Sequence, residues 1–242
     1  MAAKREPLDL TFLGSGNAFA PAGRAFSSFL VNGRYLFDCG PTVLQQLHKA
    51  GLSSEDIDLV LISHFHADHY FGLPFLFLDG WQQERTRDLW IAGPPGIEAR
   101  CEQLMALAYP SLPKRTAFRR YVEIGDGVAA TAAGLSFRTT GVSHVPDLEC
   151  FAYRVDLGGR TLVYSGDTTL CTGILEAVEG AEVIVIECSC AGEGVHLSPA
   201  GVAAIAERAP GAKVVVTHLD GHDHPDGFDG LIVASDLARF WF

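Results

Sequence analysis

Three histidines and one aspartate stand within a single short stretch, at His64, His66, Asp68 and His69. Imidazole nitrogens and carboxylate oxygens are the ligands of zinc, and also of manganese and iron. Side chains two residues apart in an extended segment point the same way, so His64 and His66 are expected to face one point. Asp68 and His69 follow in an expected tight turn and would face a second point. One loop could therefore serve two neighbouring metal ions.

A buried strand is expected directly before this loop, at residues 57–62, because the run is short and apolar. Three further ligand-type residues also follow expected strands directly: His144, Asp167 and His218. A lone histidine in such a place is more often a surface or satisfied core residue. Because α/β proteins place their sites at the carboxyl ends of strands, the joint position of these residues favours one common site.

The HxHxDH pattern after a hydrophobic strand resembles the metallo-β-lactamase superfamily. Its flanks, Ile62-Ser63 before it and Tyr70-Phe71-Gly72-Leu73-Pro74 after it, resemble the ribonuclease Z-like branch, as does the opening Thr11-Phe12-Leu13-Gly14-Ser15-Gly16. The resemblance covers nearly the whole chain. It implies an α/β fold of the four-layer αββα sandwich type, formed as a single domain over residues 1–242.

The resemblance also implies a ligand assignment for two divalent metal ions. One ion is assigned to His64, His66 and His144, the other to Asp68, His69 and His218, with Asp167 as the bridge. Two divalent ions about 3.5–4 Å apart need a bridging anion to offset their repulsion, and Asp167 can supply it. The implied protein is a hydrolase in which a metal-bound hydroxide attacks and Asp68 takes a catalytic part. Zinc is the first expectation, with manganese and iron as alternatives.

Two residues near the end of the chain resemble catalytic loops of the ribonuclease Z-like enzymes. His196 resembles a histidine that helps to protonate the leaving group, although Leu197 separates it from Ser198 and the match is partial. Glu187 resembles the glutamate of a partner loop whose histidine is missing here. We therefore predict His196 as the general acid. We predict that Glu187 contacts a side chain of the site rather than the metal or the substrate.

Several residues keep two interpretations at this stage. Asp38 is either a partner of a metal ligand or a turn residue. The sequence has one basic cluster, which consists of Lys114, Arg115, Arg119 and Arg120. This cluster either contacts substrate phosphate or forms an ordinary solvated surface, and the solvated surface is the preferred interpretation. Cys188 and Cys190 are read as core or pocket-wall thiols rather than ligands, and His222 and His224 as members of a solvated loop.

The composition restricts the class of protein. With 242 residues and 48% apolar content the chain can build a sizeable core, and its net charge of −11 disfavours a protein that grips nucleic acid through phosphates. The six cysteines are scattered without a CxxC pair, and the start lacks the apolar core of a signal peptide. We expect a cytoplasmic protein with reduced thiols and no membrane span.

The interval between His144 and Asp167 bears on the substrate. Ribonuclease Z proper carries a long arm there that grips transfer RNA, whereas this interval is short and is filled by an expected hairpin. We therefore predict a phosphodiesterase for a small or nucleotide-like phosphodiester. Transfer RNA is not expected without a partner, and a homodimer is left open. The alternatives are 3′ processing of transfer RNA, hydrolysis of a lactone or thioester, and a binding protein without chemistry.

The remaining pattern predicts the elements that position the site. Helices are expected at 41–50, 95–108 and 198–209, the last with Ser198 as its N-cap and Pro199 in its first turn. The aromatic run at 71–81 either lines a pocket or, by preference, packs in the core. Residues 231–234 and 237–242 are expected to form a closing pair of strands.

Overall fold

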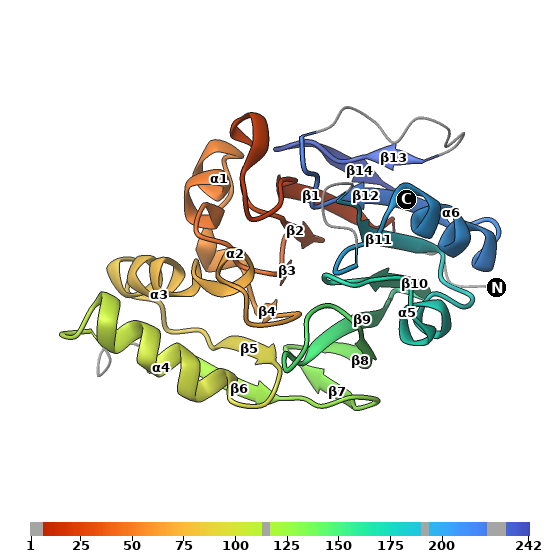
Figure 1. Ribbon diagram of the computed structural model, residues 1–242. Coiled ribbons are helices and arrows are strands. Elements are labelled where there is room, and N and C mark those ends of the chain that lie inside the picture. Colours follow the sequence, from red (N-terminus) through yellow and green to blue (C-terminus); the bar gives the residue numbers. More distant parts are fainter. Residues whose placement is uncertain (1–6, 113–116, 190–193, 222–230) are drawn as a thin grey trace, which may run out of the picture.

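The computed structural model describes residues 7–112, 117–189, 194–221 and 231–242. Two seven-stranded sheets lie face to face, and helices cover the outer side of each (Figure 1). This arrangement confirms the predicted αββα sandwich. None of the helices in the described ranges is both long enough and apolar enough to cross a membrane.

The first sheet has the strand order β14-β1-β2-β3-β4-β5-β6 and is parallel from β3 to β6. Its strands are β1 (Asp9–Gly14), β2 (Ser28–Val31), β3 (Tyr35–Phe37), β4 (Leu59–Leu61), β5 (Leu89–Gly93), β6 (Arg119–Glu123) and β14 (Arg239–Trp241). The helices beside it are α1 (Val43–Lys49), α2 (Ala67–Tyr70), α3 (Leu73–Gln82) and α4 (Ile97–Ala108). Two short 3-10 helices, Pro21–Gly23 and Ser54–Asp56, belong to the same half.

The second sheet has the order β13-β12-β11-β10-β9-β8-β7 and is parallel from β10 to β13. Its strands are β7 (Ala129–Ala132), β8 (Leu135–Val142), β9 (Cys150–Leu157), β10 (Arg160–Tyr164), β11 (Val183–Glu187), β12 (Lys213–Thr217) and β13 (Ile232–Val233). Helices α5 (Thr172–Ala177) and α6 (Pro199–Arg208) cover it. The predicted cap of α6 is present, since Ser198 Oγ accepts from the Gly201 amide at 3.2 Å.

Alternation along the strands builds the layers. In β11, Val183 and Val185 face the core between the sheets, whereas Ile184 and Ile186 face the core beneath α5 and α6. All are buried because a central strand of a sandwich has apolar neighbours on both faces. A third core joins the outer face of the first sheet to α1, α3 and α4.

The aromatic run after the metal-type loop forms α3, a helix that the sequence pattern did not predict. Leu73, Leu76 and Phe77 are buried against the first sheet, so the preferred interpretation of core packing is confirmed for them. Phe71 and Phe75 stay about 40% exposed.

The two strands expected near the end of the chain are present as β13 and β14, but they do not pair with each other. β13 pairs with β12 in the second sheet, whereas β14 pairs with β1 in the first. Between them, Leu237 takes a left-handed backbone (φ 64°), and Asp236 accepts from the amides of Ser15 and Ala25 at 2.9 and 2.7 Å. The chain thus crosses from one sheet edge to the other instead of folding back on itself.

The strand directions decide where the site forms. Strands β3 and β4 run parallel, and β10, β11 and β12 run parallel to one another. β8 has the direction of β10, because each pairs antiparallel with β9 between them. The carboxyl ends of these strands meet at one rim of the sandwich, where the ligand-type residues follow.

Candidate metal centre

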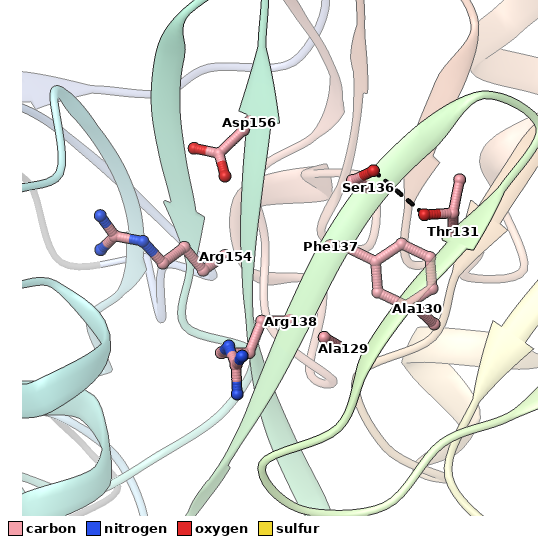
Figure 2. A pocket seen from close by; sticks show the side chains of 8 residues that line it. All are labelled: Ala129, Ala130, Thr131, Ser136, Phe137, Arg138, Arg154 and Asp156. Atoms are coloured by element: carbon pink, nitrogen blue, oxygen red, sulfur yellow. Dashed lines mark hydrogen bonds between the residues drawn. The ribbon is translucent and has the colours of Figure 1, made fainter.

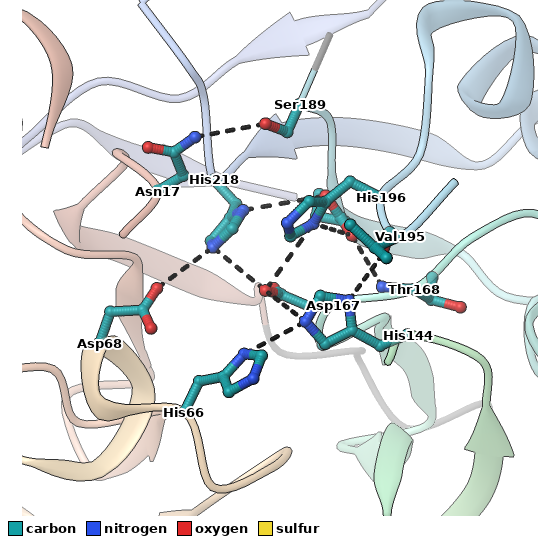
Figure 3. Close-up of polar contacts among 12 residues, drawn as sticks. Asn17, His66, Asp68, His144, Asp167, Thr168, Ser189, Val195, His196 and His218 are labelled. Atoms are coloured by element: carbon teal, nitrogen blue, oxygen red, sulfur yellow. Dashed lines mark hydrogen bonds and ion pairs between the residues drawn. The ribbon is translucent and has the colours of Figure 1, made fainter. Parts of the chain in front are cut away.

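His64, His66 and His144 come together at the rim, the first two from the loop after β4 and the third from the end of β8. One ligand atom from each lies within 4.8 Å of the others and of an Asp167 oxygen. His66 Nδ1 and His144 Nε2 are 3.2 Å apart (Figure 3). The prediction that His64 and His66 face one point agrees with this geometry.

Asp68, His69 and His218 form a second group under the same distance limit. Asp68 and His69 belong to α2 and not to a tight turn, and His218 follows β12. Asp68 Oδ2 lies 3.3 Å from His69 Nε2 and 3.5 Å from His218 Nε2. The loop after β4 therefore supplies two neighbouring groups of ligand-type side chains.

Asp167 stands between the two groups. Its Oδ2 lies 3.3 Å from the Nε2 atoms of both His69 and His218, and 3.9 and 3.8 Å from those of His64 and His144. The side chain is 2% exposed, so water cannot replace these partners. This is the position that a bridging carboxylate requires.

The site contains buried polar atoms that have no hydrogen-bond partner in the described structure. These atoms are His64 Nε2, His69 Nε2, Asp167 Oδ1, and Nδ1 and Nε2 of His218. A buried polar atom without a partner costs free energy, and native structures rarely tolerate several in one place. Lone pairs that converge from imidazole nitrogens and carboxylate oxygens are what a divalent ion would satisfy. The residues present therefore fit a metal centre.

Asp38 positions one side of this centre. It is fully buried at the end of β3, and its Oδ2 accepts from His69 Nδ1 at 2.7 Å, from Ser63 Oγ at 2.9 Å and from the Tyr164 hydroxyl at 2.6 Å. The bond to Nδ1 leaves Nε2 of His69 as the ligand atom. Of the two interpretations, the structure places Asp38 as the partner of a ligand-type histidine.

One backbone contact and one side-chain contact orient His144 and His64. His144 Nδ1 donates to the Val195 carbonyl at 2.6 Å, which turns Nε2 toward Asp167. His64 Nδ1 lies 3.0 Å from Ser63 Oγ, so its Nε2 is also directed inward. His218 itself has a left-handed backbone (φ 57°), a conformation that a non-glycine residue keeps only where its surroundings enforce it.

Two glycines allow the loop after β3 to cross the loop after β4. A Cβ on Gly40 would come within 2.3 Å of the Asp68 carbonyl oxygen, and one on Gly72 within 2.2 Å of the Gly40 carbonyl oxygen. The Gly72 amide donates to the Cys39 carbonyl at 2.7 Å, and the Cys39 amide to the His69 carbonyl at 2.6 Å. The ligand loop is thus held by main-chain contacts that only glycine permits.

His196 and Glu187 form a pair at the back of the site. His196 Nδ1 lies 2.9 and 3.0 Å from the two oxygens of Glu187, which also accepts from the Thr168 amide at 2.7 Å. No described residue takes His196 Nε2, and the ring lines the cavity (Figure 3). His196 also comes within ligand range of Asp167 and His218. The structure therefore offers two roles for His196, a proton donor and a ligand.

Burial and charge set the protonation of the cluster. Burial lowers the pKa of His64 well below its usual value, and burial also lowers the pKa of His66 and His144. These rings are then neutral, the form that binds metal. Burial alone would raise the pKa of Asp167, but charge on His218 and His69 outweighs it and holds that pKa well below the usual range. For Glu187, burial and the Asp167 carboxylate raise the pKa well above its ordinary value.

A cavity of about 380 Å³ opens over these groups. Besides site residues, its lining contains five that the sequence did not single out: Asn17, Ala18, Phe19, Val145 and Val195. The glycine turn after β1 and the residue after His144 were the available signals, but no spacing links them to the metal-type motif. The aromatic run at 71–81 contributes nothing to this lining.

A second hollow, of about 460 Å³, lies on β7, β8 and β9 and holds none of the predicted site residues (Figure 2). Arg138 and Arg154 are register partners on the neighbouring strands β8 and β9, and both line this hollow. Arg154 donates to the Ala177 and Glu179 carbonyls at the end of α5, and Arg138 to the Gly127 carbonyl. Both arginines thus cap main-chain groups.

Of the other residues considered in the sequence analysis, three lie in the described part of the chain: Arg119, Arg120 and Cys188. Arg120 pairs with Asp88 at 2.9 Å and its side chain is 44% exposed, which agrees with the solvated interpretation. Arg119 differs from that interpretation, because its side chain is 6% exposed, pairs with Glu102 at 2.7 Å and lies over the Phe77 ring. Cys188 is buried, as expected for a core or pocket-wall thiol. Five residues considered in the sequence analysis lie outside the described residues: Lys114, Arg115, Cys190, His222 and His224.

Comparison with known proteins agrees with this geometry. The sequence model of the beta-lactamase superfamily domain matches residues 33–219. A protein named ribonuclease Z from Methanosarcina acetivorans is 28% identical, and the alignment covers 96% of this chain and 97% of that protein. Ribonuclease Z from Mycobacterium avium is 30% identical, with 74% of this chain and 69% of that protein covered.

Solved structures share the fold. The metallo-beta-lactamase fold protein YhfI from Bacillus subtilis has a TM-score of 0.78 at 24% identity, covering 98% of this chain and 100% of that chain. Human tRNase Z, short form, has a TM-score of 0.75 at 23% identity, covering 96% and 98%. A diphosphatase from the PhnP family has a TM-score of 0.75 at 19% identity, covering 99% and 98%.

Proposed function

Because the chain belongs to the beta-lactamase superfamily, in its ribonuclease Z-like branch, we propose that it is a metal-dependent phosphodiesterase for a small or nucleotide-like substrate. The observation that carries the proposal is the pair of ligand groups that share Asp167. Two ions in such an arrangement, when bound, supply an acidified water and neutralise charge on the oxygens of the substrate. Zinc is the first candidate, with manganese and iron as alternatives.

The protein's own residues would hold this centre rigid. The bonds of Asp38 to His69 and of the Val195 carbonyl to His144 fix which ring nitrogen faces inward. Asp68 faces both His69 and His218 and opens onto the cavity, so it would orient the second ion and the attacking group together. Preorganised side chains in a buried site need no rearrangement as charge develops.

His196 would protonate the departing oxygen. It lines the cavity, and Glu187 holds its Nδ1, so Nε2 is the atom that can carry a proton to the substrate. An alkoxide leaving group is a strong base and needs that proton, whereas a nitrophenolate does not. Positioned acid catalysis is worth roughly 10²–10⁴-fold.

The His196→Ala variant tests this role with two substrates. Diesters with alkyl leaving groups should lose about 10²–10⁴-fold in kcat/KM, and nitrophenyl diesters far less. Equal losses on both would remove His196 from the acid role. A fall in metal content would make it a ligand instead, which the distance to Asp167 and His218 also permits.

The names of similar proteins and the short interval between His144 and Asp167 both favour a small phosphodiester as the substrate. Several relatives are named ribonucleases, and one structural neighbour is named a diphosphatase. In this chain, the hairpin of β9 and β10 occupies the interval between His144 and Asp167. The alignment with the Methanosarcina protein spans 299 positions, so that relative carries insertions that this 242-residue chain lacks.

Processing of transfer RNA is the second candidate, favoured by the near full-length alignment to proteins named ribonuclease Z. The net charge of −11 and the short interval after His144 disfavour it for the chain alone. Accurate 3′ cleavage of precursor transfer RNA by the purified protein at physiological salt would establish it over the small substrate.

A substrate panel tests the proposal as a whole. The metal-loaded protein should hydrolyse chromogenic phosphodiesters faster than phosphomonoesters, lactones or thioesters, and Asp167→Ala should lose this activity. Preferred turnover of a lactone or thioester would contradict the phosphodiester assignment and retain a hydrolase of another class.

A further inference from the structure

Phe19 is a large aromatic side chain that is 88% exposed, the most exposed of the large apolar residues in the described structure. It lies in the loop after β1 and lines the same cavity as Asp68, Asp167 and His218. An exposed aromatic ring at the mouth of a polar site buries nothing in the free protein. A single exposed apolar side chain is ordinary on a protein surface, but this one borders the cavity over the candidate metal centre.

Hydrogen bonds from Asn17 hold the loop that carries Phe19. Its Oδ1 accepts from the Phe19 amide at 3.0 Å, and its Nδ2 donates to Ser189 Oγ at 3.2 Å, after β11 (Figure 3). The backbone amide of Asn17 donates to the Leu219 carbonyl at 3.1 Å, next to His218. The loop is therefore tied to the two segments that border the candidate metal centre.

The backbone beside Phe19 is strained. Ala20 and Ala22 both have left-handed conformations (φ 45° and 54°), although neither is glycine. Such conformations persist only where the surroundings determine them, and they concentrate at ligand sites. The strain and the bonds of Asn17 indicate that the position of Phe19 is built, not incidental.

The cavity has two chemical parts. Carboxylates and imidazoles from both ligand groups form the polar part, and Ala18, Phe19, Val145 and Val195 form the apolar part. A phosphate suits the first, and a planar, weakly polar ring suits the second, because bases stack on aromatic side chains. The volume of about 380 Å³ is in the range of small-molecule sites.

We propose that Phe19 is a specificity-determining residue that stacks on the nucleobase of a nucleoside phosphodiester, with the phosphate of the substrate at the Asp167 cluster. The proposal rests on the phosphodiesterase function and names its substrate class. A nucleobase satisfies both parts of the cavity at once, whereas an alkyl or sugar phosphate leaves Phe19 in water.

The test measures binding, so that it does not depend on turnover. The zinc-loaded protein is titrated by calorimetry with adenosine 5′-monophosphate and with ribose 5-phosphate, which share the sugar and the phosphate but of which only the first carries a base. The wild type should prefer the nucleotide by about 5- to 150-fold, the range expected for one stacked base. Phe19→Ala should remove the preference and leave ribose 5-phosphate binding unchanged, whereas Phe19→Trp should keep it.

Phe75→Ala is the matched control, because Phe75 is an exposed phenylalanine outside the cavity lining. It should keep the full preference. A wild type that binds both ligands equally, or a Phe19→Ala variant that keeps the preference, would overturn the proposal. So would a Phe19→Ala variant that changes only the oligomeric state in gel filtration.

The same experiment separates this proposal from the function beneath it. Base-selective binding that depends on Phe19, without turnover of any diester, would support the stacking and contradict the phosphodiesterase. Diester hydrolysis that changes neither with the Phe19→Ala substitution nor with the presence of a base would support the phosphodiesterase and contradict the stacking.

Discussion

The two halves of the sandwich supply the candidate metal centre in different ways. The first half provides His64, His66, Asp68 and His69 from one loop, held by main-chain contacts to Cys39 and Gly72. The second half provides His144, Asp167 and His218 singly, from the ends of β8, β10 and β12. The first set is positioned by local geometry, whereas the second depends on an assembled sheet.

This difference has an energetic consequence. An ion that binds residues from both halves binds the folded state and not the unfolded chain, so its binding energy stabilises the sandwich. Variants on the two sides should therefore differ in kind. A change in the local loop should disturb metal affinity, and a change at the junction should affect both halves together.

Asp167→Ala should have the largest effect, because Asp167 Oδ2 lies within 3.9 Å of histidine nitrogens from both groups. We expect kcat/KM to fall on the order of 10³-fold or more and the content of both ions to drop. Elemental analysis and phosphodiesterase assays measure this. Asp156→Ala, on the exposed face of β9, is the control. Retention of full metal content would show that Asp167 does not join the groups.

Chelation tests the coupling between the halves. At a metal concentration of 100 to 1,000 times Kd, bound metal adds about 2.7–4.1 kcal/mol of stability. Removal of the metal by the chelator should then lower Tm by roughly 5–15 °C for a chain of this size. Scanning calorimetry with and without chelator gives the value. An unchanged Tm would mean that the ligands are not shared between the sheets.

Asp38→Asn should weaken the local half while leaving the fold in place. The carboxylate accepts from His69 Nδ1 and from Ser63, and an amide cannot accept all of these bonds. We expect metal affinity to fall about 10- to 100-fold, measured by competition with a chromophoric chelator. Asp88→Asn on the surface should change nothing. An effect no larger than that control would make Asp38 only a turn residue.

Gly72→Ala should have the smallest effect of the four. The added Cβ would meet the Gly40 carbonyl oxygen at 2.2 Å, so the two loops must separate. We expect unfolding free energy to fall by about 1–3 kcal/mol, measured by denaturant titration. Gly125→Ala, whose Cβ would meet nothing closer than 3.9 Å, is the matched control. Equal stability of the two variants would exclude the crossing as a constraint.

The sequence predicted what is local. The ligand loop, the strand before it and the cap of α6 were readable because their partners lie within a few residues. α3 was missed because its run from Leu73 to Gln82 is apolar almost throughout, so it shows no helical face. The crossing of β13 and β14 to opposite sheets depends on pairing with β12 and β1, which no local pattern encodes.

For the site, too, the sequence predicted residues in local motifs but not contacts between distant parts of the chain. The ligand-type residues were named from their places at strand ends, but Asp38 stayed open because Tyr164, one of its partners, is 126 positions away. Phe19 and Asn17 were not found, because the loop after β1 reaches the cavity only through contacts with Ser189 and Leu219.

We propose that both halves of the sandwich build one dinuclear centre that drives phosphodiester hydrolysis. The most direct test is titration of metal-free protein with zinc, with bound metal and hydrolysis of bis(4-nitrophenyl) phosphate followed together. We predict that bound metal approaches two equivalents and that activity rises with the second, as the two groups around Asp167 require. Full activity in a protein that never binds more than one equivalent would contradict the account.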